Sequence, residues 1–69
     1  MQIKAELAGN LWKVVVRLGQ QVQADETLMI LESMKMEIPI TAPNAGRVTK
    51  IHAMEGETVQ EGQLLIEVG

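Results

Sequence analysis

Apolar and polar residues alternate along most of this chain with a period of two. Near its start, for example, Ile3, Ala5 and Leu7 alternate with polar side chains. This spacing puts every second side chain on one face of an extended strand, as in strands with a single buried face. No segment combines apolar residues at 3.6-residue spacing with the capping residues of a helix. The pattern predicts eight short strands separated by turns, over residues 1–7, 11–18, 21–23, 27–34, 36–42, 47–53, 58–60 and 64–68.

The chain also contains an internal repeat. When the sequence is shifted by 37 residues, nine of the 32 overlapping positions are identical, whereas average residue frequencies would give about two. The identical pairs are Ile3/Ile40, Ala5/Ala42, Ala8/Ala45, Gly9/Gly46, Lys13/Lys50, Gly19/Gly56, Val22/Val59, Gln23/Gln60 and Leu28/Leu65. The shared glycines predict turns with positive φ. Asp25 stands where the second copy has Gly62, so we expect that turn to hold an aspartate in a left-handed conformation.

Two copies of a four-strand unit indicate an all-β fold. One copy could not bury its own apolar face, but two copies facing each other could. We therefore expect a flattened barrel or sandwich of two four-stranded antiparallel sheets with pseudo-two-fold symmetry. At 69 residues, the chain is expected to form a single domain over residues 1–69.

Composition excludes several function classes. The chain has no cysteine and a single histidine, His52, so neither a disulfide framework nor a Cys/His metal cluster is expected. A net charge of -3 and one aromatic residue argue against a nucleic-acid partner, which would select basic stripes and stacking rings. No apolar run approaches the roughly 20 residues of a membrane span, and no signal peptide is visible. We expect a cytoplasmic domain, monomeric in isolation, with no membrane partner.

Two other residues need an interpretation. Trp12, the only aromatic side chain, is expected to close one end of the barrel, with a partner contact as the alternative. Met54 is expected to fill the core or its rim.

The candidate functional residue is Lys35. It lies where the two copies meet, between the expected strands 27–34 and 36–42, so a hairpin would place it at the tip. Met34 and Met36 flank it, and Glu32 and Glu37 lie just outside them. Methionines usually fill cores or adaptable binding surfaces, so two of them in an exposed turn are unusual for a solvated surface. The alternative is an ordinary solvated turn lysine with both methionines packed back onto the barrel, but the position of Lys35 at the centre of the repeat favours function.

These residues carry a resemblance to a known family. Residues 32–37 (ESMKME) resemble the biotinyl-lysine signature of biotin carboxyl carrier domains, and residues 38–43 (IPITAP) and 46–48 (GRV) resemble the segments that follow it. The likeness covers essentially the whole chain. The family is that of biotinyl/lipoyl attachment domains, and it implies the flattened two-sheet barrel expected above.

The resemblance implies covalent attachment of biotin to Lys35. Met34 and Met36 indicate biotin rather than lipoate, because lipoyl domains usually carry Asp-Lys-Ala at these positions. The chain has no insertion between Arg17 and Gln21, so it is similar to the short kind that lacks a protruding thumb and includes stand-alone attachment proteins.

The implied function is that of a non-catalytic carrier. A biotin protein ligase would modify Lys35, and the biotin arm would move carboxyl groups between biotin carboxylase and carboxyltransferase subunits or domains. Glu32 and Glu37 are candidates for docking to basic surfaces of these partners, or form an ordinary solvated strand face. Two alternatives are a lipoyl carrier of a 2-oxoacid dehydrogenase-type complex and an unmodified structural or interaction barrel. An enzyme is not expected, since no nucleophile–base pair, metal set or phosphate loop is present.

Overall fold

The computed structural model describes all residues, 1–69, and consists of strands and turns alone. It contains no helix of the length and apolar character that crossing a membrane requires. The eight strands are β1 (Gln2–Lys4), β2 (Gly9–Val14), β3 (Gln21–Val22), β4 (Thr27–Ser33), β5 (Met36–Thr41), β6 (Gly46–Ile51), β7 (Thr58–Val59) and β8 (Leu64–Val68).

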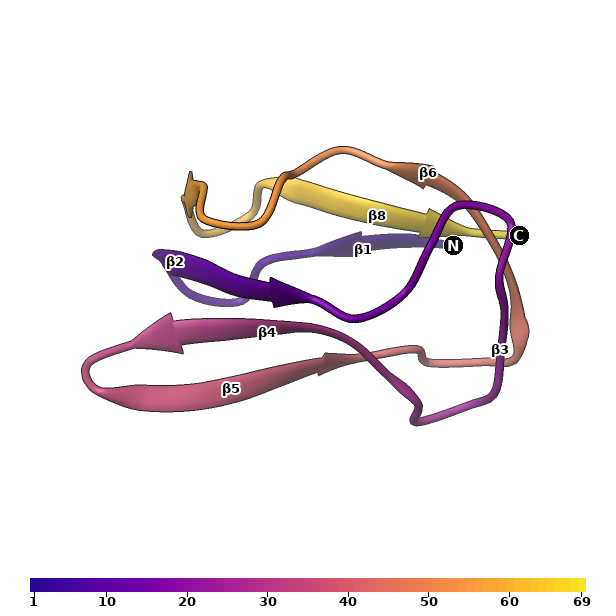
Figure 1. Cartoon of the computed structure of the whole chain (residues 1–69), viewed down its shortest axis with the longest axis horizontal. Coiled ribbons are helices and arrows are strands. Elements are labelled where there is room, and N and C mark those ends of the chain that lie inside the picture. The colour runs from indigo at the N-terminus through magenta and orange to yellow at the C-terminus, as the bar shows by residue number, and fades with distance from the viewer.

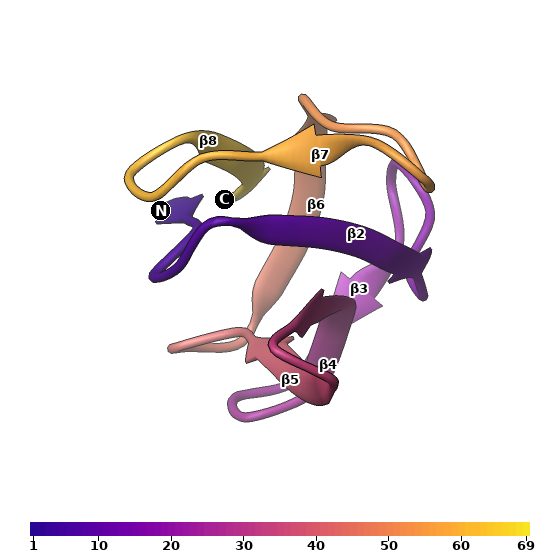
Figure 2. The ribbon, with the colours of Figure 1, turned by 90° about the vertical axis from the view of Figure 1, so that its left-hand side faces the viewer.

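The strands form two four-stranded sheets, in the orders β1-β8-β6-β3 and β5-β4-β2-β7. Every pair of neighbouring strands is antiparallel. Figure 1 shows the two layers from the side, and Figure 2 shows how they enclose a flattened barrel. This is the fold class that the strand pattern and the repeat predict.

The repeat governs the architecture down to single residue pairs. Shifting the first half by 37 residues places β1–β4 on β5–β8 and exchanges the two sheets. The pairing of Gly9 with Val59 in one sheet becomes the pairing of Val22 with Gly46 in the other. Backbone hydrogen bonds repeat as well, for example from the Ala5 amide to the Gln63 carbonyl and from the Ala42 amide to the Glu26 carbonyl. The two halves therefore form a pseudo-two-fold symmetric unit.

The core is apolar throughout. Fifteen residues are buried, none of them polar or charged, and they form one cluster: Ile3, Ala5, Leu11, Val16, Val22, Leu28, Met29, Leu31, Ala42, Val48, Ala53, Val59, Leu65, Ile66 and Val68. All except Ile3 pair off with another member across the repeat, and the counterpart of Ile3, Ile40, is half-buried. Each half thus contributes an equivalent apolar face, which is why one half alone would leave its face in water.

Most of the turn predictions are confirmed. Gly62 has a φ of +83°, and Asp25, its counterpart, adopts the expected left-handed conformation at +66°. Gly9 and Gly46 are an exception, because they begin strands β2 and β6 rather than forming positive-φ turns. At both positions neighbouring atoms leave no room for a Cβ atom, as described for Gly9 below.

Several expected boundaries and burials were wrong. β1 spans residues 2–4 rather than 1–7, and β2 spans 9–14 rather than 11–18. After β2 the chain crosses to the other sheet, so Leu18 does not continue the alternation and is 66% exposed. Met54 is 75% exposed and fills neither the core nor its rim. Trp12 is 42% exposed on the outer surface and does not close a barrel end.

Candidate functional site

Lys35 lies at the tip of the hairpin formed by β4 and β5, as predicted. Ser33 pairs with Met36, so Met34 and Lys35 form a two-residue turn. Their φ angles are +53° and +64°. Positive φ at both central residues defines a type I′ turn, whose twist matches that of the flanking strands. Asn-Gly is the usual sequence for this turn, and other residues cost about 1–2 kcal/mol each in the left-handed region. The hairpin therefore holds two side chains in a conformation that they do not favour.

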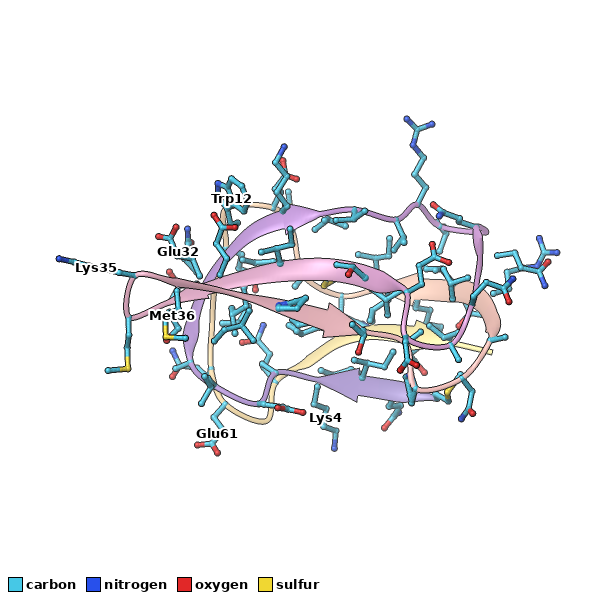
Figure 3. All side chains as sticks on the ribbon, turned by 90° about the horizontal axis from the view of Figure 1, so that it is seen from below. Lys4, Trp12, Glu32, Lys35, Met36 and Glu61 are labelled. Carbon is cyan, nitrogen blue, oxygen red and sulfur yellow. The ribbon has the colours of Figure 1, made fainter.

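The tip is fully accessible. Figure 3 shows the Lys35 side chain extending away from the barrel, and Figure 1 places the hairpin at the end opposite both chain termini. Met34 is 91% exposed and Met36 62% exposed. Two flexible thioethers beside the amine therefore present apolar surface to water.

No group on this chain is placed to activate the lysine. The only ion pair in the molecule, His52 with Glu67, involves other residues, and no side-chain hydrogen bond reaches Lys35. There is also no cluster of His, Cys, Asp or Glu that could hold a metal.

Glu32 and Glu37 lie directly opposite each other across the hairpin. Both are exposed, and neither forms an ion pair. Like charges at directly opposed positions destabilise a strand pair. The hairpin thus carries two directly opposed carboxylates one residue pair away from the Ser33–Met36 pair that flanks the turn.

Two contacts hold the end of β4, next to the turn, against Ala8 and Gly9. The Ser33 hydroxyl donates a hydrogen bond of 3.0 Å to the Ala8 carbonyl oxygen. Next to it, Gly9 packs so closely that a Cβ atom there would lie 2.5 Å from the Glu32 carbonyl oxygen and 3.1 Å from the Ser33 Cβ. Sequence reasoning missed both positioning residues. The glycine shared by the two copies was a usable signal, but it indicated close approach and not a turn.

Outside the hairpin, one charged pair stands out. The His52 Nε2 and Glu67 Oε2 atoms are 2.7 Å apart on the outer face of the other sheet. This hydrogen bond lowers the pKa of Glu67 below its ordinary value; partial desolvation opposes the shift, and the positive charge of Lys50 adds to it. The pair belongs to the sheet that does not carry Lys35, and we assign it no part in the site.

Comparison with known proteins agrees with this geometry. The family model described as "Biotin-requiring enzyme" matches residues 1–68, so the chain belongs to the biotin and lipoyl attachment domain family. A biotin/lipoyl attachment protein of Bacillus subtilis is 47% identical over 68 residues, which cover 99% of this chain and 93% of that protein. The biotin carboxyl carrier protein of Streptococcus mutans is 45% identical over 64 residues, 93% of this chain and 49% of that one.

A solved structure supports the fold independently. The crystal structure of the Kluyveromyces lactis urea carboxylase superposes with a TM-score of 0.94 and 32% identity. The match covers 100% of this chain and only 6% of the urea carboxylase chain. The same fold unit thus occurs as nearly a whole protein in one relative and as a small part of a long chain in another.

Proposed function

We propose that the Lys35 amine is the site at which this non-catalytic carrier domain bears biotin. The observation that carries the proposal is the mounting of Lys35, which extends from a two-residue turn at the end of the barrel, free of side-chain partners. The residues fit a covalently attached group, because the amine is exposed and nothing on the chain would have to move to admit it. Lys4, Lys13 and Lys50 lie on strands and have no comparable setting.

The attachment reaction needs little from this domain. The neutral Lys35 amine attacks the carbonyl carbon of biotinyl-adenylate held by a biotin protein ligase. An amide C–N bond forms, the C–O bond to the phosphate breaks, AMP leaves with that electron pair, and the nitrogen loses a proton to the ligase or solvent. A lysine amine is normally protonated at neutral pH, so the ligase must supply the base and the orientation. The domain supplies an exposed amine on a fixed turn.

Once attached, biotin supplies a ring nitrogen that can accept and release a carboxyl group. We place this domain between a biotin carboxylase site and a carboxyltransferase site, which the likeness to a urea carboxylase and to a biotin carboxyl carrier protein supports. Tethering makes each visit effectively intramolecular and raises the local concentration of the arm. A stiff β-hairpin is a suitable mount, because it limits where the arm can swing.

The neighbours of Lys35 have distinct proposed roles. Met34 and Met36 provide apolar surface that a ligase recognises beside the amine, and their 91% and 62% exposure supports this. Glu32 and Glu37 provide a doubly negative patch for basic side chains of a partner.

Intact mass measurement tests the proposal. The domain is coexpressed with a biotin protein ligase in the presence of biotin, and the adduct is located by peptide mapping. We expect one biotinyl group on Lys35 and none after Lys35→Arg. A triple variant in which Lys4, Lys13 and Lys50 become arginine should still accept one. An adduct on any of these three lysines, or none on the wild-type chain, would refute the assignment.

Lipoate is the second candidate, because the relative with 47% identity is named a biotin/lipoyl attachment protein. The same mass measurement with a lipoate ligase and lipoate separates the two. We expect biotin to be the better substrate. The double variant Met34→Asp with Met36→Ala should shift the preference toward lipoate. An unmodified structural barrel would instead show no adduct from either ligase, and Lys35→Ala would leave cellular function intact.

A further inference from the structure

Trp12 lies on the outside of the sheet that carries Lys35, and a β-bulge puts it there. Leu11 pairs with Leu31 and Lys13 pairs with Ile30, so Trp12 is the extra residue between two consecutive pairs. Leu11 is fully buried, whereas Trp12 and Lys13 are both exposed. A bulge turns two adjacent side chains to the same side of the sheet, which explains this pair. The Lys13 Nζ lies 5.6 Å from the centre of the indole ring.

The fold does not need tryptophan at this position. The same bulge occurs in the other sheet, between the pairs Val48–Val68 and Lys50–Glu67, and its extra residue is Thr49. Thr49 is the counterpart of Trp12 across the repeat and is also exposed. A threonine therefore satisfies the backbone geometry, and the large half-exposed ring of Trp12 requires a different explanation.

The neighbours of Trp12 form an ordered surface. On the outer face of β2, β4 and β5, the row of side chains nearest the turn contains Glu32 opposite Glu37. The next row away from the tip contains Ile30 opposite Pro39, and the Trp12 bulge borders it. We call these five residues the Trp12 face. It has an apolar strip bordered, on the side of Lys35, by two carboxylates. Figure 3 shows Trp12 projecting outward at the same end of the molecule as Glu32 and Lys35.

Reach decides which partner this face can meet. Backbone geometry gives about 1.2 Å of length per bond, so the Lys35 Nζ extends roughly 6 Å from its Cα, and the ring of an attached biotin roughly 13 Å. The Trp12 bulge lies opposite Leu31 and Ile30, three to four residues along β4 from the turn, or roughly 12 Å. A ligase must bring the amine itself into its active site, so its surface has to lie against the hairpin and the adjoining rows. A carboxylase site takes the distant ring and can leave this face uncovered.

We propose that the Trp12 face is the docking surface for the biotin protein ligase, an inference that rests on Lys35 being the attachment site. The complementary surface on the ligase is an apolar recess for the indole next to lysine or arginine side chains for Glu32 and Glu37. Exposed tryptophans are frequent centres of binding energy, and flanking charges set the approach and orientation.

Steady-state biotinylation kinetics test this inference, with the unmodified domain as the varied substrate. Trp12→Ala should raise the KM for the domain about tenfold or more and change kcat less than twofold, because the loss is in docking and not in chemistry. Thr49→Ala, at the matched position of the other sheet, should have wild-type kinetics. A swap variant, Trp12→Thr with Thr49→Trp, keeps the composition and moves the indole to the wrong sheet. It should be as impaired as Trp12→Ala.

Each remaining outcome would count against the inference. A wild-type KM for Trp12→Ala would overturn it, and so would equal losses for Thr49→Ala. Normal labelling of Trp12→Ala, followed by slow carboxylation of its biotinylated form by a biotin carboxylase, would assign the face to that enzyme instead. Complete absence of labelling on the wild-type domain would reject the Lys35 assignment itself and is distinguishable from all of these. Unchanged thermal unfolding of the variants confirms that kinetics report docking.

Discussion

Gly9 supports the hairpin that carries Lys35 by leaving room for the backbone of Glu32. A Cβ atom at position 9 would lie 2.5 Å from the Glu32 carbonyl oxygen, closer than folded proteins allow. Its counterpart Gly46 has an equivalent contact in the other sheet, where a Cβ would lie 2.7 Å from the Gly69 carbonyl oxygen and 2.8 Å from a Val68 methyl. The symmetric half therefore supplies a control that shares the packing problem but lies far from Lys35.

We predict that Gly9→Ala destabilises the fold and slows biotinylation, because β2 or the hairpin must move to accommodate the methyl group. Crowding of this kind costs about 1–3 kcal/mol, which urea unfolding would measure. Gly46→Ala should also destabilise the fold, yet a folded sample should be labelled at the wild-type rate. Equal effects of both variants on labelling would show that the contact between Gly9 and the hairpin does not position Lys35.

The two left-handed residues of the turn predict a trade between stability and recognition. Met34→Gly should stabilise the fold by about 0.5–1 kcal/mol. It removes the steric cost of a side chain at φ +53°, and the greater backbone entropy that glycine loses on folding cancels only part of this gain. Labelling should nevertheless fall, since the exposed thioether is lost. Asp25→Gly is the control: it relieves a similar φ of +66° and restores the residue found at Gly62, so it should raise stability without changing labelling. Denaturant midpoints and initial labelling rates measure both effects.

Much of this molecule could be predicted from its sequence because the repeat adds information that single strands lack. The shift of 37 residues predicts equivalent turns and equivalent core positions in both halves, and the structure confirms this for Asp25 and Gly62 and for buried pairs such as Leu28 and Leu65. The same repeat predicts a junction at Lys35, which the structure shows as the hairpin tip.

The errors trace to β-bulges and to crossings between sheets. Strict alternation predicts that Trp12 and Lys13 lie on opposite faces, but the bulge places both outside. The run of alternating residues toward Leu18 continues past the point where β2 ends at Val14, because the chain leaves its sheet there. The type I′ geometry of the turn could not be predicted either, because Met34 and Lys35 are not the asparagine and glycine that usually occupy such a turn. The bulge, the end of β2 and the turn type all depend on which strands pair, and most of the paired residues are distant in sequence.

The contact between His52 and Glu67 predicts a specific pH response. The hydrogen bond holds the pKa of Glu67 below its ordinary value, so it stabilises the fold above the ordinary carboxyl pKa of about 4.3 and loses this effect as the pH falls toward the lower, folded-state pKa. In the first half, the equivalent positions are Val15 and Ile30. His52→Val should raise the pKa of Glu67 toward its ordinary value. NMR titration of the Glu67 carboxylate measures this change. The double variant His52→Val with Glu67→Ile should lose this part of the acid dependence of unfolding. An unchanged Glu67 titration in His52→Val would rule out the hydrogen bond as the cause.

The opposed carboxylates of Glu32 and Glu37 predict opposite effects on stability and on docking. Glu37→Lys converts a repulsive cross-strand pair into an attractive one and should stabilise the fold by about 0.2–1 kcal/mol, seen as a higher thermal midpoint. The same change places a cation on the Trp12 face and should raise the KM for biotinylation, most strongly at low salt.

Glu61→Lys separates this local effect from the change in net charge. Figure 3 shows Glu61 at the hairpin end of the molecule, and it belongs to the turn between β7 and β8, away from the Trp12 face. It therefore alters the charge of the same end without touching the proposed docking surface, and its KM should stay close to wild type. If Glu61→Lys raised the KM as much as Glu37→Lys at every salt concentration, the ligase would be responding to overall charge, and the carboxylate pair would have no specific part in docking.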